Sequence, residues 1–85
     1  MTEFEYVVKD PVGIHARPAG LLVRLANKFD ADIEIIKDGR AADAKRIFSV
    51  MGLGVQCGDT IHVRISGDDA QKAADALLRF IQEHF

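Results

Sequence analysis

A histidine and an arginine stand two positions apart in the segment Gly13-Ile14-His15-Ala16-Arg17-Pro18. A neutral imidazole is nucleophilic at physiological pH, so His15 could attack phosphorus and form a phosphoramidate without a second base. The transferred phosphoryl group carries about −1.5 to −2 charges. Arg17 offers that group a full positive charge and a bidentate fork for its oxygens. These residue types suit phosphoryl transfer, with His15 as the acceptor and Arg17 as the stabilising cation.

The residues that follow predict a helix with His15 at its start. Apolar residues recur at helical spacing after Ala19, and polar residues fill the opposite side. Pro18 is tolerated only in the first turn, so the helix begins at about Ala16 or Arg17. His15 is then at or beside the N-cap. We expect phosphate binding around Ala16, Arg17 and Pro18, because unpaired amides and the positive end of the helix dipole favour anions.

Spacing alone favours a plainer interpretation. His15 could be a solvated loop residue, and Arg17 a solvated charge at a helix start. Pro18 could be only a start signal for the helix. A choice between the two interpretations needs more than this segment.

Four segments show the period-two alternation or the turn signals of β-strands. They are Phe4 to Val8, Asp32 to Lys37, Arg40 to Ala44 and Thr60 to Ile65. Asp38-Gly39 favours positive φ at both positions, which predicts a two-residue hairpin between the second and third strands.

Two more helices complete the expected fold. Arg46 to Met51 is a short apolar segment ended by glycine, compatible with one or two helical turns. Asp68 and Gln71 have the spacing of a capping box, ahead of an apolar stripe that runs to the C-terminus. The element order βαββαβα predicts an α+β fold, a single domain over residues 1–85, with all helices on one face of a four-stranded sheet.

Composition excludes several classes of function. A net charge of −2 without a block of basic residues argues against a nucleic-acid partner. One cysteine, Cys57, and three separated histidines do not form a zinc pattern, and we expect no metal and no cofactor. No secretion signal or 18-residue apolar run is present, so we expect no membrane insertion and a cytoplasmic location. A free-standing enzyme is disfavoured, because no nucleophile–base pair or phosphate-binding glycine loop is visible.

The chain resembles the HPr phosphocarrier proteins of the phosphoenolpyruvate-dependent sugar phosphotransferase system. The resemblance centres on G-I-H-A-R-P at Gly13 to Pro18. It extends to the segments Ala26 to Ile33 and Lys45 to Gly54, and to the chain length and element order. It implies an HPr-like open-faced β-sandwich with antiparallel sheet order 1-4-2-3 and three helices on one face.

The resemblance also implies a role for each residue of the motif. His15 would be phosphorylated on Nδ1 by enzyme I, with phosphoenolpyruvate as the source, and would pass the group to IIA proteins or domains. Arg17 matches the arginine that steadies the phosphoryl group. The protein would be a carrier that depends on its partners for catalysis, and we expect a monomer.

A partner-binding surface is implied around the short second helix, through Ile47, Phe48, Met51 and Leu53. From the residues alone such positions are more often core, and we expect at least two of them to be buried. Basic residues on the first helix and at the start of the second could form a polar rim around the exposed remainder. They are Arg24, Lys28 and Arg46.

Arg46 departs from a pattern common in low-GC Gram-positive members of the family. Those often carry a regulatory serine at this position, and arginine cannot accept a phosphoryl group from the family's serine kinase. We expect Arg46 to contact acidic partner surfaces instead. His62, His84 and Cys57 are expected to be ordinary surface residues, with His84 in a frayed C-terminus.

Two alternatives of function stay open. One is a phosphocarrier of the nitrogen-related branch, with the same chemistry and regulatory acceptors. The other is an HPr-like binding regulator that does not relay phosphate. Retained His15 and Arg17 argue against the second alternative, because a pure binder would not need both at a helix start.

Overall fold

The computed structural model describes residues 1–85 and contains the seven elements expected from the sequence, in the order βαββαβα. The second strand has the predicted bounds, and the bounds of the other strands and of the first two helices differ from the predicted ones by no more than two residues. The elements are β1 (Thr2–Val7), α1 (Ala16–Ala26), β2 (Asp32–Lys37), β3 (Arg40–Asp43), α2 (Ile47–Met51), β4 (Thr60–Ser66) and α3 (Ala70–His84).

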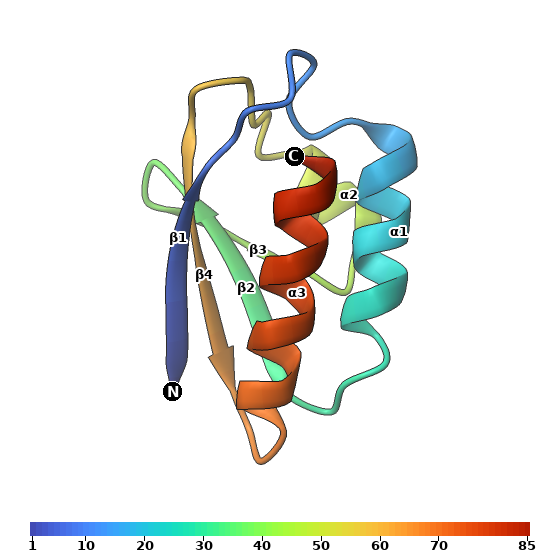
Figure 1. The fold of residues 1–85 in the computed structure, drawn as a ribbon, viewed down its shortest axis with the longest axis vertical. Helices are drawn as coiled ribbons and strands as arrows, with labels where there is room; N and C mark the ends of the chain where they lie inside the picture. Colours follow the sequence, from blue (N-terminus) through green and yellow to red (C-terminus); the bar gives the residue numbers. More distant parts are fainter.

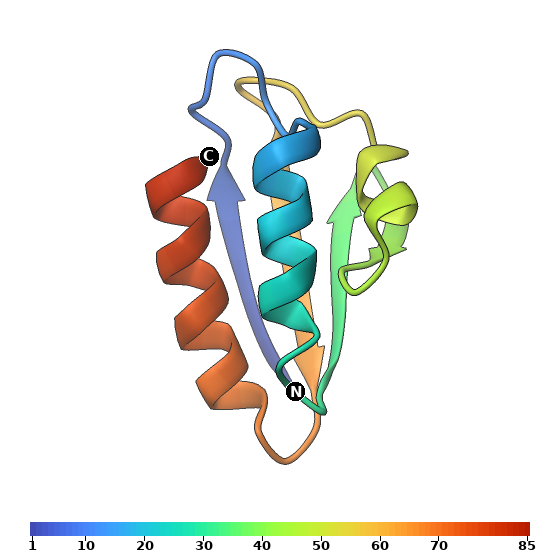
Figure 2. The same cartoon turned by 90° about the vertical axis from the view of Figure 1, so that its right-hand side faces the viewer.

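The four strands form one antiparallel sheet in the order β1-β4-β2-β3, which confirms the expected topology. The register places Phe4 opposite Val63, and Ile33 opposite Ile65. Figures 1 and 2 show the three helices on one side of this sheet. The other face of the sheet is open, as predicted, and it carries His62 and Arg64.

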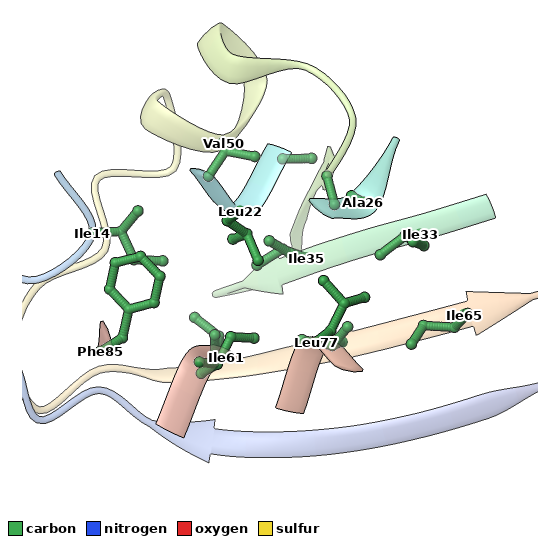
Figure 3. Close-up of a cluster of buried hydrophobic side chains, with 14 of the residues drawn as sticks. Ile14, Leu22, Ala26, Ile33, Ile35, Val50, Ile61, Ile65, Leu77 and Phe85 are labelled. Atoms are coloured by element: carbon green, nitrogen blue, oxygen red, sulfur yellow. The ribbon is translucent and has the colours of Figure 1, made fainter. Parts of the chain in front are cut away.

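The core lies between the sheet and the helices and contains 22 buried apolar residues. Alternate residues of β2 and β4 point into it, among them Ile35 and Ile61 (Figure 3). Leu22 of α1 and Leu77 of α3 face them from the helical layer. No polar or charged residue is buried, so apolar burial provides the main driving force for this fold.

The hairpin between β2 and β3 has the predicted turn. Asp38 and Gly39 both adopt positive φ, at 51° and 79°. Such a turn matches the right-handed twist of the flanking strands. This two-residue connection fixes Lys37 opposite Arg40 in the register.

The predicted capping box at the start of α3 is wrong. The N-cap is Asp69, and no side chain caps the helix. The Asp69 carboxylate instead accepts hydrogen bonds from the amides of Asp30 and Ala31, each at 2.9 Å. These two amides lie in the loop between α1 and β2, so Asp69 joins the start of α3 to a segment almost 40 residues earlier in the chain.

None of the helices combines the length and the apolar character that crossing a membrane requires.

Candidate functional site

His15 is the N-cap of α1, as the sequence predicted. Its backbone is extended, with φ −124° and ψ 171°, and its carbonyl oxygen accepts the first bond of the helix, from the Ala19 amide at 2.9 Å. Its side chain makes no capping hydrogen bond and is 41% exposed. The backbone of His15 therefore starts the helix, while the imidazole stays free for chemistry.

The first turn of α1 offers amide groups beside this imidazole. The amides of Ala16 and Arg17 donate to no protein group, because the helix has no acceptor for them. Pro18 has no amide hydrogen, and its buried ring fixes the backbone of the turn. No acidic residue lies in this turn, so its positive potential is not neutralised within the helix.

The loop before His15 is fixed by a close backbone contact. Gly13 has a φ of +78°, and a side chain there would place its Cβ 2.3 Å from the carbonyl oxygen of Val55. The same oxygen accepts a hydrogen bond from the Ile14 amide at 3.1 Å. Glycine at this position is therefore required by both conformation and space, and the contact holds the chain that leads into His15.

The segment that contains Val55 is itself fastened to the sheet. The Asp59 carboxylate accepts a hydrogen bond from the Gln56 amide at 2.8 Å and forms an ion pair with Lys37 at 3.0 Å. The Gln56 bond, with the Lys37 ammonium, lowers the pKa of Asp59 below its usual value. His15 thus rests on a loop that β2 anchors through Lys37.

A pocket of about 450 Å³ opens in front of His15. It is lined by both motif residues, His15 and Arg17, and by residues of the preceding loop, of α1 and of the end of α3. The lining residues are Asp10, His15, Arg17, Pro18, Leu21, Glu83 and His84.

The end of α3 is an unpredicted part of this site, and the expected frayed C-terminus is wrong. The His84 ring stacks on Phe80 at a centroid distance of 4.2 Å. Phe85 is buried with 3% exposure, and its backbone oxygen accepts a hydrogen bond from the Asp10 amide at 2.7 Å. Phe85 is four residues after Ile81, so the apolar stripe of the helix was a usable signal for its burial.

The predicted docking residues have unequal exposure. Phe48 is 88% exposed, while Ile47 and Met51 are half-buried and pack against the core. Leu53 is 4% exposed and is a core residue, so its predicted place on the docking surface is wrong. Its side chain is enclosed because the chain turns back toward the sheet after α2, where the Leu53 carbonyl accepts a hydrogen bond from Arg40.

The predicted basic rim is on the surface. Arg24 and Lys28 are exposed on the polar side of α1. Arg46 is the N-cap of α2, its side chain is 78% exposed, and its only ion pair is with Asp43 at 3.6 Å. Because α1 packs against α2, these cations and Phe48 belong to neighbouring elements of the helical layer (Figure 2).

His62 lies outside the site, on the open face of the sheet. Its Nε2 is 3.1 Å from Glu3, and its Nδ1 is 3.4 Å from Glu5. Hydrogen bonding to Glu3, followed by that to Glu5, raises the pKa of His62 above its usual value. The sequence did not predict these partners, because β1 and β4 are far apart along the chain and meet only in the register of the sheet.

Known proteins match almost the whole length of this chain. A sequence model of the family described as the PTS HPr component phosphorylation site matches residues 2–83. The chain is 42% identical over 83 residues to the HPr-like protein Crh of Halalkalibacterium halodurans, covering 98% of this chain and 99% of that one. It is 36% identical over 85 residues to the phosphocarrier protein HPr of Mycoplasma pneumoniae, covering 99% and 97%.

A solved structure matches the fold of this chain. The histidine-containing phosphocarrier protein of Mycoplasma superposes with a TM-score of 0.94 at 33% identity, covering 96% of this chain and 93% of the other. The family model and the solved structure both match almost the whole chain, including the helix that begins at His15. The chain belongs to the HPr family of the phosphotransferase system, which includes the phosphocarrier proteins named HPr.

Proposed function

We propose that this protein accepts a phosphoryl group on His15 from phospho-enzyme I, with phosphoenolpyruvate as the original source, and donates it to IIA proteins or domains for sugar uptake. The observation that carries the proposal is an exposed N-cap imidazole beside two amides that no protein group engages. Family membership supports the same role.

The transfer requires one bond to form and one to break at phosphorus. The lone pair of the His15 Nδ1 forms the new N–P bond, and the bond between phosphorus and the donor's leaving atom breaks. The amides of Ala16 and Arg17 can donate to the phosphoryl oxygens at the positive end of α1. The Arg17 guanidinium, which lines the same pocket, adds a full charge to this stabilisation.

The geometry suits a carrier that hands its group to partners. The pocket is a shallow opening on the surface, and 41% of the His15 side chain is exposed, so a partner's active site can reach the ring. The same exposure lets one partner place a phosphoryl group on the ring and another remove it. The partners then supply the remaining catalytic groups.

Docking would use the helical layer next to the site. Phe48 offers an apolar contact at 88% exposure, and half-buried Ile47 and Met51 flank it. Arg24, Lys28 and Arg46 would form the basic rim and meet acidic partner surfaces. A small apolar centre with a charged rim suits complexes that form and separate quickly.

A binding regulator is the second candidate, because one similar protein is named HPr-like protein Crh. A phosphocarrier of the nitrogen-related branch is a variant of the first candidate with other acceptors. The free amides at His15 favour a carrier over a pure binder, since a binder has no need of an exposed nucleophile at an anion site.

The proposal is tested by phosphorylation in vitro. The chain is incubated with phosphoenolpyruvate, magnesium and a generic enzyme I, and we expect an acid-labile phosphoryl group on the protein. His15→Ala should abolish the label, while His62→Ala, which alters a histidine on the opposite face, should retain it. An unlabelled wild-type chain, with enzyme I active on a control carrier, would favour the binding regulator.

A further inference from the structure

A carboxylate faces the ring nitrogen of His15 that the proposed transfer leaves unused. The Oδ2 of Asp10 is 3.9 Å from the Nε2 of His15, and both side chains line the same pocket. The Asp10 side chain is 27% exposed, compared with 41% for His15. The other carboxylate of this pocket, that of Glu83, forms no ion pair with His15, so Asp10 is the acidic group that acts on the ring directly.

Asp10 is held in place by its own backbone and side-chain bonds. Its Oδ1 accepts a hydrogen bond from the Val12 amide at 2.8 Å, and its carbonyl oxygen accepts one from the Gly13 amide at 2.9 Å. Its amide donates to the backbone oxygen of Phe85 at 2.7 Å. One carboxylate oxygen is thus engaged in the turn, which directs the other toward His15.

We propose that Asp10 is a positioning residue for phosphoryl transfer, and that it keeps the ring proton of His15 on Nε2 so that Nδ1 presents its lone pair to phosphorus. This inference rests on the proposed function. A neutral imidazole carries its proton on one nitrogen and a lone pair on the other. A negative charge beside Nε2 favours the form with the N–H on that side.

The same carboxylate serves the ring after transfer. When Nδ1 forms its bond to phosphorus and the donor's leaving atom takes the electron pair of the broken bond, the ring becomes positively charged. The proton stays on Nε2, so the new charge develops next to Asp10. When the phosphoryl group leaves for an acceptor, the N–P electron pair returns to Nδ1 and the ring is neutral again.

The test separates the charge of Asp10 from its role in the turn. Asp10→Asn and Asp10→Ser keep an oxygen that can accept from the Val12 amide and remove the negative charge. Asp68→Asn is the matched control. Asp68 is exposed and lies just before the N-terminus of α3, whereas the pocket is at the C-terminal end of this helix. With a rise of about 1.5 Å per residue, the helix separates the two by about 20 Å. Amide spectra of each variant confirm that the fold is kept.

Two quantities are measured. The tautomer of His15 is determined from its ring nitrogen resonances in the unphosphorylated chain at about pH 8.5. The second quantity is the initial rate of labelling by enzyme I. We expect the proton on Nε2 in the wild type, a larger Nδ1–H fraction in both Asp10 variants, and a labelling rate reduced about two- to fivefold. Asp68→Asn should match the wild type in both.

Wild-type tautomer and labelling rate in the Asp10 variants would overturn the inference, as would a wild-type ring with its proton on Nδ1. A slower rate with an unchanged tautomer would also overturn it, because Asp10 would then act on docking or on the turn. Failure of the proposed function is a separate result, since it is seen as an unlabelled wild-type chain.

Discussion

His62 shows how one residue can acquire properties that its neighbours in sequence do not reveal. Glu3 and Glu5 occupy alternate positions of β1, and the register places Glu5 directly opposite His62. Both ring nitrogens therefore face carboxylates, at 3.1 Å and 3.4 Å. Both nitrogens can donate only when the ring is protonated, so the arrangement stabilises the charged imidazole.

The raised pKa of His62 predicts a pH-dependent contribution to stability. A group with a higher pKa in the folded state stabilises the fold fully below its unfolded pKa, here the ordinary value of 6.5, and the contribution is lost as pH rises through the folded pKa. We expect His62→Gln to lower the free energy of unfolding more at about pH 5.5 than at about pH 8.5. Urea unfolding of both chains at the two pH values measures the difference.

The control for this prediction removes the partners. In a Glu3→Gln, Glu5→Gln background, His62→Gln should have the same effect at both pH values, because no carboxylate is left to favour the charged ring. A pH-independent effect in the wild-type background would mean that His62 acts only through packing on the sheet.

The sequence predicted single residues well where the signal was local. His15 was placed at the helix start because Pro18 restricts the first turn and the apolar period begins after it. Asp10, Glu83 and His84 were not assigned to the site, because their meeting depends on how the end of α3 packs against the loop before α1. Such contacts between distant segments are set by tertiary packing and leave no pattern in spacing.

At the scale of elements, the start of α3 is fastened to the rest of the fold by one carboxylate. Asp69 receives the amides of Asp30 and Ala31, one on each oxygen. Gly67, just before it, lies so close to Ala31 that a side chain would place its Cβ 2.9 Å from the Ala31 Cα. The loop after α1 and the turn before α3 therefore form one packed corner.

Loss of the Asp69 carboxylate should destabilise the protein by about 1–3 kcal/mol, because two backbone amides lose a charged acceptor. We expect this from Asp69→Ala in urea unfolding at neutral pH. Asp68→Ala is the matched comparison, since it removes the residue that the sequence suggested as the cap, and its effect should stay within about 0.5 kcal/mol. A larger loss of stability from Asp68→Ala than from Asp69→Ala would contradict this prediction and support Asp68 as the cap.

The period and turn signals were sufficient for every element, and the sheet order followed from the family resemblance. The exact start of α3 could not be predicted. Asp68 and Asp69 are both acceptable caps by type, and the choice depends on amides brought near by the α1–β2 loop. The cap is therefore decided by a contact between segments almost 40 residues apart.

At the scale of the whole molecule, the two faces of the sheet differ in what covers them and in which residues they carry. The helices cover one face of the sheet, and the other face is open (Figure 1). The helical side carries the proposed transfer site and the exposed Phe48, whereas His62 lies on the open face with Glu3 and Glu5. Spacing alone could not separate Phe48 from Leu53, because both are apolar residues in or near a short helix. Only packing shows that the first is 88% exposed and the second 4%. The monomer expected from the sequence stays a prediction.

Phe48 and Leu53 should respond oppositely to truncation. Phe48→Ala removes little buried surface, so the free energy of unfolding should change by no more than about 0.5 kcal/mol. Leu53→Ala opens a cavity and should cost about 2–5 kcal/mol. If the helical layer is the docking surface, Phe48→Ala should also raise the Kd for enzyme I about fivefold or more. An exposed aromatic residue at the centre of an interface often contributes over 1 kcal/mol to binding.

Calorimetric titration of enzyme I, together with urea unfolding, measures both quantities. Val7→Ala is the control for general surface hydrophobicity, because Val7 is 49% exposed on the opposite face of the sheet. It should leave the Kd unchanged. An equal loss of affinity from Val7→Ala, or none from Phe48→Ala, would move the docking surface away from α2 and leave the His15 end of α1 as the part of the molecule that partners contact.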